Sequence, residues 1–133
     1  MNQTDKEQLR RKILKNRQSL SKSQWQAKSN SICENLQNSS LYRQAKTILA
    51  YFSFRQEANL NPLWQDNKTW GFPRCVNDNL QWHFWQQGEP LENNKYGISE
   101  PLATSPIISP QQVDLILIPT VACDYQKYRL GYG

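Results

Sequence analysis

The sequence of 133 residues has few cysteines and histidines, which excludes two common kinds of small scaffold. Its three cysteines, Cys33, Cys75 and Cys123, lie far apart and form no C-x-x-C pair. An odd number of widely spaced cysteines argues against a disulfide framework and indicates a reducing compartment. His83 is the only histidine and the cysteines are not clustered, so the usual ligand set of a zinc site is missing. We interpret this lone histidine, which lies among aromatic residues, as a packing or surface residue.

Long apolar runs are missing as well. No apolar run follows the basic N-terminal stretch, so we expect no signal peptide. No stretch approaches the length that spans a bilayer, and the mean hydropathy is −0.81. The motifs GK[ST] and GxSxG are also absent, which excludes a Walker loop and a nucleophile elbow. We therefore expect a cytoplasmic protein with no membrane partner.

Aromatic residues and positive charge are what the sequence does contain. Five tryptophans, six tyrosines and four phenylalanines distinguish it from a disordered chain, and its length suits one domain over residues 1–133. The net charge of +5 favours anionic partners, such as nucleic acid or phosphorylated and carboxylated small molecules. The aromatic and basic residues do not gather in one stretch, so we interpret the aromatic residues as core and expect no nucleic-acid partner.

The first forty residues have the pattern of two amphipathic helices. TDKE at Thr4–Glu7 fits a capping box, and an apolar stripe runs from Leu9 to Leu20. A second helix start, SKSQ at Ser21–Gln24, precedes an apolar face that runs from Trp25 to Leu36. A short break therefore separates the two helices.

Apolar segments with strand character follow, separated by turns and one long irregular stretch. The expected strands are 47–54, 70–74 (ending at Pro73), 80–85 and 113–119, with a short helix near 61–66, an irregular surface loop over 86–112 and a loop after residue 119. Helices followed by buried strands predict an α/β domain. We expect a three-layer Rossmann-like sheet with helices on both faces, incomplete at the C-terminus.

Two loops carry candidate ligand-binding residues, because ligands bind beyond the carboxyl ends of strands in open sheets. One is FSFRQE, which ends in Glu57, and the other is RLGYG, which begins with Arg129. Glycines and an arginine suit an anion. Lys6 and Arg10 lie one turn apart on the first helix and suit phosphates. Each feature alone also fits a plainer interpretation, namely a surface turn, a solvated glutamate or helix charges that aid solubility.

Taken together and in order, five segments resemble the 5-formyltetrahydrofolate cyclo-ligases, also called 5,10-methenyltetrahydrofolate synthetases. They are KEQLRRK, AYFSFRQE, FPR, GISEP and DLILIPTVACDYQKYRLGYG, of which the last is the specific one. The resemblance covers nearly the whole chain. The sequence departs from the family pattern at Thr120 and Lys127, where glycine is usual, and at Leu60, where threonine is common. The family usually continues with G-G-[YF]-Y-D-R, whose aspartate it uses for magnesium.

The resemblance implies an enzyme that uses Mg-ATP to activate the formyl oxygen of 5-formyltetrahydrofolate. Nitrogen 10 then attacks, phosphate leaves, and 5,10-methenyltetrahydrofolate and ADP are released. The implied nucleotide-binding residues are Lys6, Arg10, Arg129 (also the catalytic residue), Leu130, Gly131, Tyr132 and Gly133. The implied substrate-binding residues are Phe52, Glu57 and Tyr132. No residue is assigned to the metal, and we expect a monomer whose partners are folate and ATP.

Two alternatives stay open beside this interpretation. The chain is expected to be a truncated form of the family, so it would bind nucleotide or folate at most, without catalysis. An α/β sheet without its last elements exposes apolar strand edges, and we expect the isolated chain to be unstable or prone to aggregate. A basic, aromatic-rich nucleic-acid binder is the other alternative, and only the charge supports it.

Overall fold

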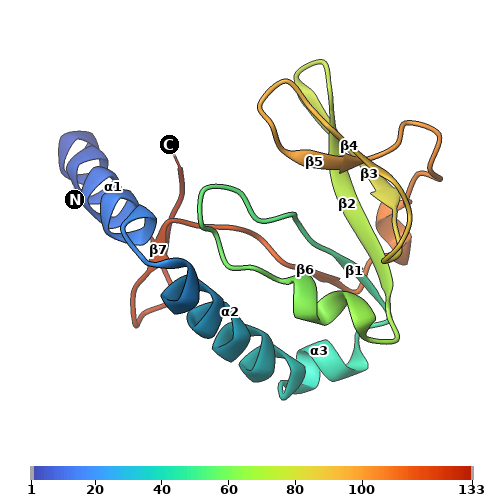
Figure 1. Cartoon of the computed structure of the whole chain (residues 1–133), viewed down its shortest axis with the longest axis horizontal. Helices are drawn as coiled ribbons and strands as arrows, with labels where there is room; N and C mark the ends of the chain where they lie inside the picture. Colours follow the sequence, from blue (N-terminus) through green and yellow to red (C-terminus); the bar gives the residue numbers. More distant parts are fainter. Residues whose placement is uncertain (1, 133) are drawn as a thin grey trace.

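The computed structural model describes residues 2–132, and these form a mixed α/β fold around a four-stranded sheet (Figure 1). The strand order is β3-β2-β1-β6, with β1 parallel to both β2 and β6 and with β3 antiparallel to β2. The bounds are β1 Thr47–Leu49, β2 Thr69–Val76, β3 Asn79–Phe84 and β6 Leu115–Ile116. The prediction of an α/β fold is therefore confirmed, with a sheet that is mainly parallel.

Three helices precede or flank the first strand. They are α1 Gln3–Gln18, α2 Lys22–Gln37 and α3 Ser40–Gln44. The capping box at Ser21 and Gln24 is confirmed. The predicted cap at Thr4 is wrong, because Asn2 caps α1 and accepts a hydrogen bond from the Asp5 amide at 2.9 Å. An asparagine side chain meets the same need for an acceptor as a threonine hydroxyl. The sequence pattern did not predict α3, which is only five residues long.

The strands differ from their predicted bounds for local reasons. β1 ends at Leu49 rather than at residue 54, because the chain then leaves the sheet as a loop in which Arg55 and Gln56 have left-handed φ angles of 51° and 60°. β2 continues through Pro73, where a break was expected. β1 pairs with β2 only at Thr69–Gly71, so at Pro73 the strand has one neighbour and tolerates a missing amide donor.

Two predicted loops contain further structure. The stretch 86–112 holds a hairpin of β4 Leu91–Asn93 and β5 Ser99–Pro101 and a short 3₁₀ helix η2 at Pro110–Gln112, so the expectation of an irregular loop is wrong in part. The segment after β6 is also a hairpin, of β7 Ala122–Cys123 and β8 Arg129–Leu130. The expected short helix is confirmed as the 3₁₀ helix η1 at Asn61–Gln65.

An aromatic cluster forms the centre of the core. Trp70 and Phe72 of β2 are almost fully buried, and Phe52 stacks on Phe72 with ring centroids 4.1 Å apart. Trp64 and Trp85 meet the Phe72 ring edge-on at 4.9 and 5.3 Å. The interpretation of the aromatic residues as core is thus confirmed for these five.

The two faces of the sheet are covered differently. Buried side chains of α2, α3 and η1 join the core cluster that contains Ile48 and Trp70. On the other face Gly71 leaves room for neighbouring side chains, since a Cβ there would lie 2.2 Å from Ile108 and 2.7 Å from Leu49. Ile108 belongs to an irregular segment, and a second helical layer stays a prediction.

The packing of His83 and the exposure of the sheet edge bear on two more expectations. His83 is buried, with Nδ1 at 2.7 Å from the Ser105 carbonyl and Nε2 at 3.0 Å from the Gln81 side chain, so its packing role is confirmed. Ile116 of the edge strand β6 and Ile118, two residues beyond its end, are 48% and 56% exposed. Aggregation of the chain stays a prediction, but these residues are where it would begin.

Candidate functional site

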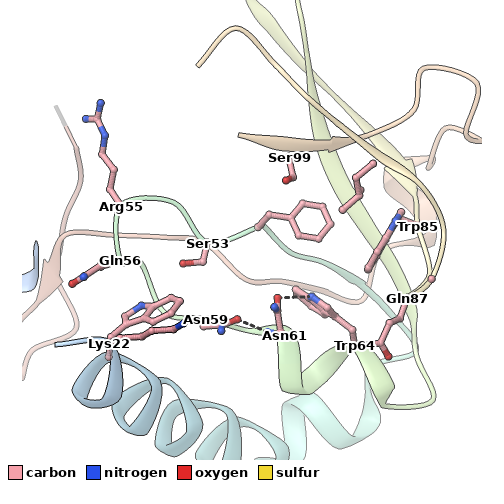
Figure 2. A pocket seen from close by; sticks show the side chains of 14 residues that line it. Lys22, Ser53, Arg55, Gln56, Asn59, Asn61, Trp64, Trp85, Gln87 and Ser99 are labelled. Carbon is pink, nitrogen blue, oxygen red and sulfur yellow. Dashed lines mark hydrogen bonds between the residues drawn. The ribbon is translucent and has the colours of Figure 1, made fainter. Parts of the chain in front are cut away.

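A cavity of about 680 Å³, here called the aromatic cavity, lies between the 52–61 loop, the start of α2 and the β3–β4 connection. Figure 2 shows Trp64, Trp85 and Gln87 at one end and Lys22, Arg55 and Gln56 at the other. Phe52 lines it as well, and no aspartate or glutamate of residues 2–132 does. Apolar rings with a few amide groups suit a flat heteroaromatic ligand.

Two amide side chains of this cavity are fixed by hydrogen bonds. Asn61 accepts from the Trp64 indole at 3.1 Å, as Figure 2 shows. The Asn59 side chain donates to Gln26 at 3.1 Å and accepts from the Asn61 amide at 3.0 Å. The wall of the aromatic cavity is therefore held in place before any ligand arrives.

A smaller cavity of about 280 Å³, here called the loop cavity, contains Glu57. Its wall is formed by Leu14, Arg17, Gln18, Phe54, Arg55, Glu57 and Tyr132. The Glu57 carboxylate accepts from the Phe54 amide at 3.0 Å and from the Tyr132 hydroxyl at 2.6 Å. Arg55 lines both this cavity and the aromatic cavity, so the two adjoin at that residue.

The electrostatic environment around Glu57 keeps Tyr132 of the loop cavity and the nearby Tyr51 protonated. Burial, followed by the hydrogen bond to Glu57, raises the pKa of Tyr132, and the hydrogen bond from Arg17 opposes this. Burial and the nearby Glu57 carboxylate also raise the pKa of Tyr51 to about 12. Near neutral pH, Tyr132 is therefore a hydrogen-bond donor beside an acceptor carboxylate.

A third cavity of about 540 Å³, here called the hairpin cavity, lies between α1 and the β7–β8 hairpin. Lys6 of α1 and Arg129 of β8 both line it, together with Leu130, Asp124 and Tyr128. The Asp124 carboxylate is used within the turn, where it accepts from the Gln126 and Tyr128 amides at 2.9 Å each. Two cations at one cavity suit a phosphate-bearing ligand.

The structure brings some of the predicted site residues together and separates others. Lys6 meets Arg129 and Leu130 at the hairpin cavity, and Glu57 meets Tyr132 at the loop cavity. Phe52 lies on the aromatic cavity instead. The Nε of Arg10 donates to the Gly131 carbonyl at 2.8 Å, so this arginine contacts the predicted nucleotide segment itself. Gly133 was predicted to bind the nucleotide and lies outside the described residues.

The left-handed backbone conformation that glycine favours does not occur at Gly131 of RLGYG but at another residue of the hairpin. Gly131 does not have a left-handed φ, and a Cβ there would meet nothing within 4 Å. The left-handed position in this hairpin is Lys127, with a φ of 70°, where the resemblance given above predicts a glycine. The sequence also did not predict that Arg17 lines the loop cavity, because nothing in its local pattern distinguishes it from the other basic residues of α1.

Within residues 2–132, no group of three His, Cys, Asp or Glu side chains is placed to hold a metal ion. The described part of the chain also contains no helix with the length and apolar character of a membrane span.

The fold and these cavities define a class: an α/β protein with an aromatic cavity adjoining a glutamate-containing one and with a separate cationic cavity. A sequence model described as the 5-formyltetrahydrofolate cyclo-ligase family matches residues 2–133. The 5-formyltetrahydrofolate cyclo-ligase of Haemophilus influenzae is 32% identical over 141 aligned positions, which cover 100% of this chain and 75% of that relative. The chain belongs to the 5-formyltetrahydrofolate cyclo-ligase family.

Further relatives agree with this assignment. The probable 5-formyltetrahydrofolate cyclo-ligase of Schizosaccharomyces pombe is 27% identical over 112 positions, 77% of this chain and 55% of that protein. The Aquifex aeolicus 5,10-methenyltetrahydrofolate synthetase superposes with a TM-score of 0.84 at 27% identity, covering 96% of this chain and 67% of the other. A Mycoplasma pneumoniae synthetase gives a TM-score of 0.68 at 24% identity over 97% and 72%, and supports the fold alone.

Proposed function

We propose that this protein catalyses the ATP-dependent cyclisation of 5-formyltetrahydrofolate to 5,10-methenyltetrahydrofolate, with release of ADP and phosphate. In this reaction the formyl oxygen takes up the terminal phosphoryl group of ATP. Nitrogen 10 of the folate then attacks the formyl carbon, and the phosphate leaves with the former formyl oxygen. Catalysis of phosphoryl transfer rests on positioning and on stabilisation of charge, and both require fixed cations and fixed acceptors.

Family membership carries the proposal, and the arrangement of the cavities supports it. The folate ring system would occupy the aromatic cavity, with Phe52 in contact and with Glu57 and Tyr132 reached where Arg55 joins the two cavities. Each Glu57 oxygen accepts one hydrogen bond already, and a carboxylate oxygen has room for a second from a ligand N–H.

The nucleotide would bind at the hairpin cavity. Lys6 and Arg129 line it, and both are long cationic side chains that suit phosphate oxygens. Arg10 would support this site by holding the Gly131 carbonyl, and Leu130 would contribute to the wall. The cations fit ATP, and we assign Arg129 the catalytic role of stabilising charge on the transferred phosphoryl group.

Residues 2–132 contain no group of three His, Cys, Asp or Glu side chains that could hold magnesium, so we derive no step through the metal. Mg²⁺ that accompanies ATP is commonly held by the phosphates, water and one or two carboxylates. The remaining expectations, namely a single three-layer domain, a monomer and a cytoplasmic location, belong to the same proposal. The single domain rests on the chain length, the location on the cysteine usage and the lack of long apolar runs, and the monomer on the family resemblance.

The test measures formation of the methenyl product from 5-formyltetrahydrofolate and Mg-ATP by its near-ultraviolet absorbance. We expect product that depends on ATP, and Glu57→Gln should lower kcat/KM by at least about tenfold, because it removes a charged acceptor. Glu34→Gln, an exposed glutamate of α2, is the matched control and should leave turnover unchanged. Binding of folate or ATP without product would instead support the non-catalytic alternative, and neither binding nor product would overturn both.

A further inference from the structure

Arg17 lies in the last turn of α1 and contacts Tyr132 of the predicted substrate site. Its Nη1 donates to the Tyr132 hydroxyl at 3.0 Å, and its guanidinium lies 5.6 Å from the centre of the Tyr132 ring. The two residues are 115 positions apart in the sequence, so the contact is entirely tertiary. Neither the composition nor the family resemblance gives Arg17 a role.

The chemistry of this contact fixes the direction of the next hydrogen bond. Arginine has donors only, so the Tyr132 oxygen must accept from Arg17. The single hydroxyl proton of Tyr132 is then directed to the second partner, Glu57, at 2.6 Å. The other Glu57 oxygen is held by the Phe54 amide at 3.0 Å. Both oxygens of the carboxylate are therefore oriented, one by its own loop and one by α1 through Tyr132.

A second arginine of α1 holds the same segment. Arg10 donates to the carbonyl of Gly131, the residue before Tyr132. Arg10 and Arg17 are separated by two helical turns, which places them on one face of α1. Tyr132 is thus held at its backbone by one arginine and at its hydroxyl by the other, and the hydroxyl contact leads to Glu57.

These contacts contribute little to the packing of the fold itself. α1 has no buried residue, and the Nε of Arg17 is buried without a hydrogen-bond partner among the described residues. The geometry of Arg17 instead serves the hydroxyl that it contacts.

We propose that Arg17 is a positioning residue, which holds Tyr132 and through it orients the Glu57 carboxylate that receives the folate. This inference deepens the proposed function and rests on it for the identity of the ligand. It predicts that loss of Arg17 weakens the folate site while leaving the nucleotide site and the fold intact.

The first experiment measures the affinity of the full 133-residue chain for 5-formyltetrahydrofolate by tryptophan fluorescence, since Trp25 and Trp85 line the aromatic cavity. Arg17→Ala should weaken binding by about fivefold, a typical size for coupling between residues in one hydrogen-bond network. Arg17→Lys should lose less than Arg17→Ala, because it keeps the charge and a donor. Arg11→Ala, an exposed arginine of the same helix, is the matched control and should bind as the parent does.

The double variant separates positioning from a general loss of structure. If Arg17 acts through Tyr132, Arg17→Ala combined with Tyr132→Phe should bind folate no more weakly than Tyr132→Phe alone. ATP affinity should change by less than twofold in each variant. The inference would be overturned if the double variant lost folate affinity by the product of the two single losses. It would also be overturned if the variants lost as much affinity for ATP as for folate.

The second experiment needs no ligand, and it separates failure of this inference from failure of the proposed function. Difluorotyrosine placed at position 132 reports its own ionisation by ¹⁹F NMR. The charged or titratable groups that face it are Arg17, Glu57, Arg55 and Tyr51. Arg17→Ala should raise the pKa of the phenol and Glu57→Gln should lower it, whereas Arg11→Ala should not change it.

If the parent chain does not bind 5-formyltetrahydrofolate, the proposed function fails, and the ionisation of residue 132 then decides on the positioning contact alone. An unchanged pKa in Arg17→Ala would overturn that contact whether or not folate binds. A raised pKa with unchanged folate affinity would also overturn the inference, because the contact would then have no consequence for the site.

Discussion

The sheet core and the pair formed by α1 and residues 120–132 are held together by different kinds of interaction. In the core, Phe72 and Trp70 are almost fully buried and aromatic rings meet at centroid distances from 4.1 Å upward. Along α1 no residue is buried, and the contacts to residues 131 and 132 are one hydrogen bond each from Arg10 and Arg17 and the position of the Arg17 guanidinium over the Tyr132 ring. In Figure 1, α1 and β7 lie at one side of the sheet.

This difference separates stability from ligand binding. Apolar burial dominates the free energy of folding, whereas exposed hydrogen bonds contribute little to it. The candidate phosphate-binding residues Lys6 and Arg129, and Tyr132 beside Glu57, lie in the weakly packed region, where side chains remain accessible to ligands. Substitutions in the core should therefore change unfolding, and substitutions in the α1 region should change binding with little effect on unfolding.

The largest expected effect follows from removal of a core ring. Phe72→Ala should lower the free energy of unfolding by about 3–5 kcal/mol, because Phe52, Trp64 and Trp85 would face the cavity that is left. Urea denaturation followed by circular dichroism measures this change. Tyr125→Ala, at an exposed position of the β7–β8 hairpin, is the control and should change the free energy by less than about 0.5 kcal/mol. Similar losses in both variants would remove the distinction between the two regions.

Lys68 provides a polar contact that belongs to the core region. Its Nζ donates to the carbonyls of Tyr42 and Ala45 at 2.7 Å each and of Arg43 at 3.1 Å, which satisfies the C-terminal end of α3. Lys68→Met should lower the free energy of unfolding by about 1–3 kcal/mol, since these carbonyls would lose a charged donor. Urea denaturation again provides the measurement.

The control for this change is Lys95→Met. Lys95 lies 5.1 Å from the ring of the exposed Tyr96, and its removal should have no measurable effect. If Lys68→Met is as stable as this control, the α3 carbonyls are satisfied by water and the contact adds nothing.

A stabilising change is expected in the hairpin. Lys127 has a φ of 70°, a left-handed conformation that costs a residue with a side chain about 1–2 kcal/mol. Lys127→Gly should raise the free energy of unfolding by about 0.5–1 kcal/mol, because the greater freedom of glycine in the unfolded chain offsets part of the gain. Lys127→Ala keeps a Cβ and should give no gain. A larger gain from alanine than from glycine would show that the side chain, and not the backbone, is unfavourable there.

The sequence predicted the buried elements well and the ends of elements poorly. Periodicity located α2 and its cap, and apolar runs located β3 and the centre of the sheet. The same apolar character continued past Leu49 into the loop that contains Phe52, since that loop also packs against the core. Apolar composition reports burial, and it does not distinguish a buried loop from a strand.

The site was predicted in part, and the missing part depends on tertiary contacts. Glu57 and Tyr132 were assigned to one substrate site by resemblance, and the structure places them in hydrogen-bond contact 75 residues apart. Arg10 was assigned to phosphates, whereas its Nε contacts the Gly131 carbonyl. Arg17 could not be singled out, because its role depends on a partner 115 residues away and on no local pattern.

The smallest expected effect concerns acid stability at the base of the sheet. One Asp114 oxygen accepts from the amides of Lys46 and Thr47 at 2.9 and 3.0 Å, and these backbone hydrogen bonds lower its pKa below the ordinary value of 3.8. A lowered carboxylate pKa contributes stability that is present above the unfolded value and is lost as the pH falls through the folded value. Asp114→Asn should therefore flatten the fall of the unfolding free energy at and below about pH 4.

Urea denaturation over a pH series measures this change, with Asp78→Asn in the β2–β3 turn as the matched control. The Asp78 variant should keep the acid dependence of the parent chain. Asp114 joins β6 to the start of β1, so a flattened profile would show that a polar contact at the exposed strand edge does contribute to the stability of the sheet. Identical acid profiles for all three proteins would mean that the Asp114 contact adds nothing and that backbone pairing with β1 and apolar packing hold β6 in place, and the contrast between core and surface contacts would then be sharper than proposed.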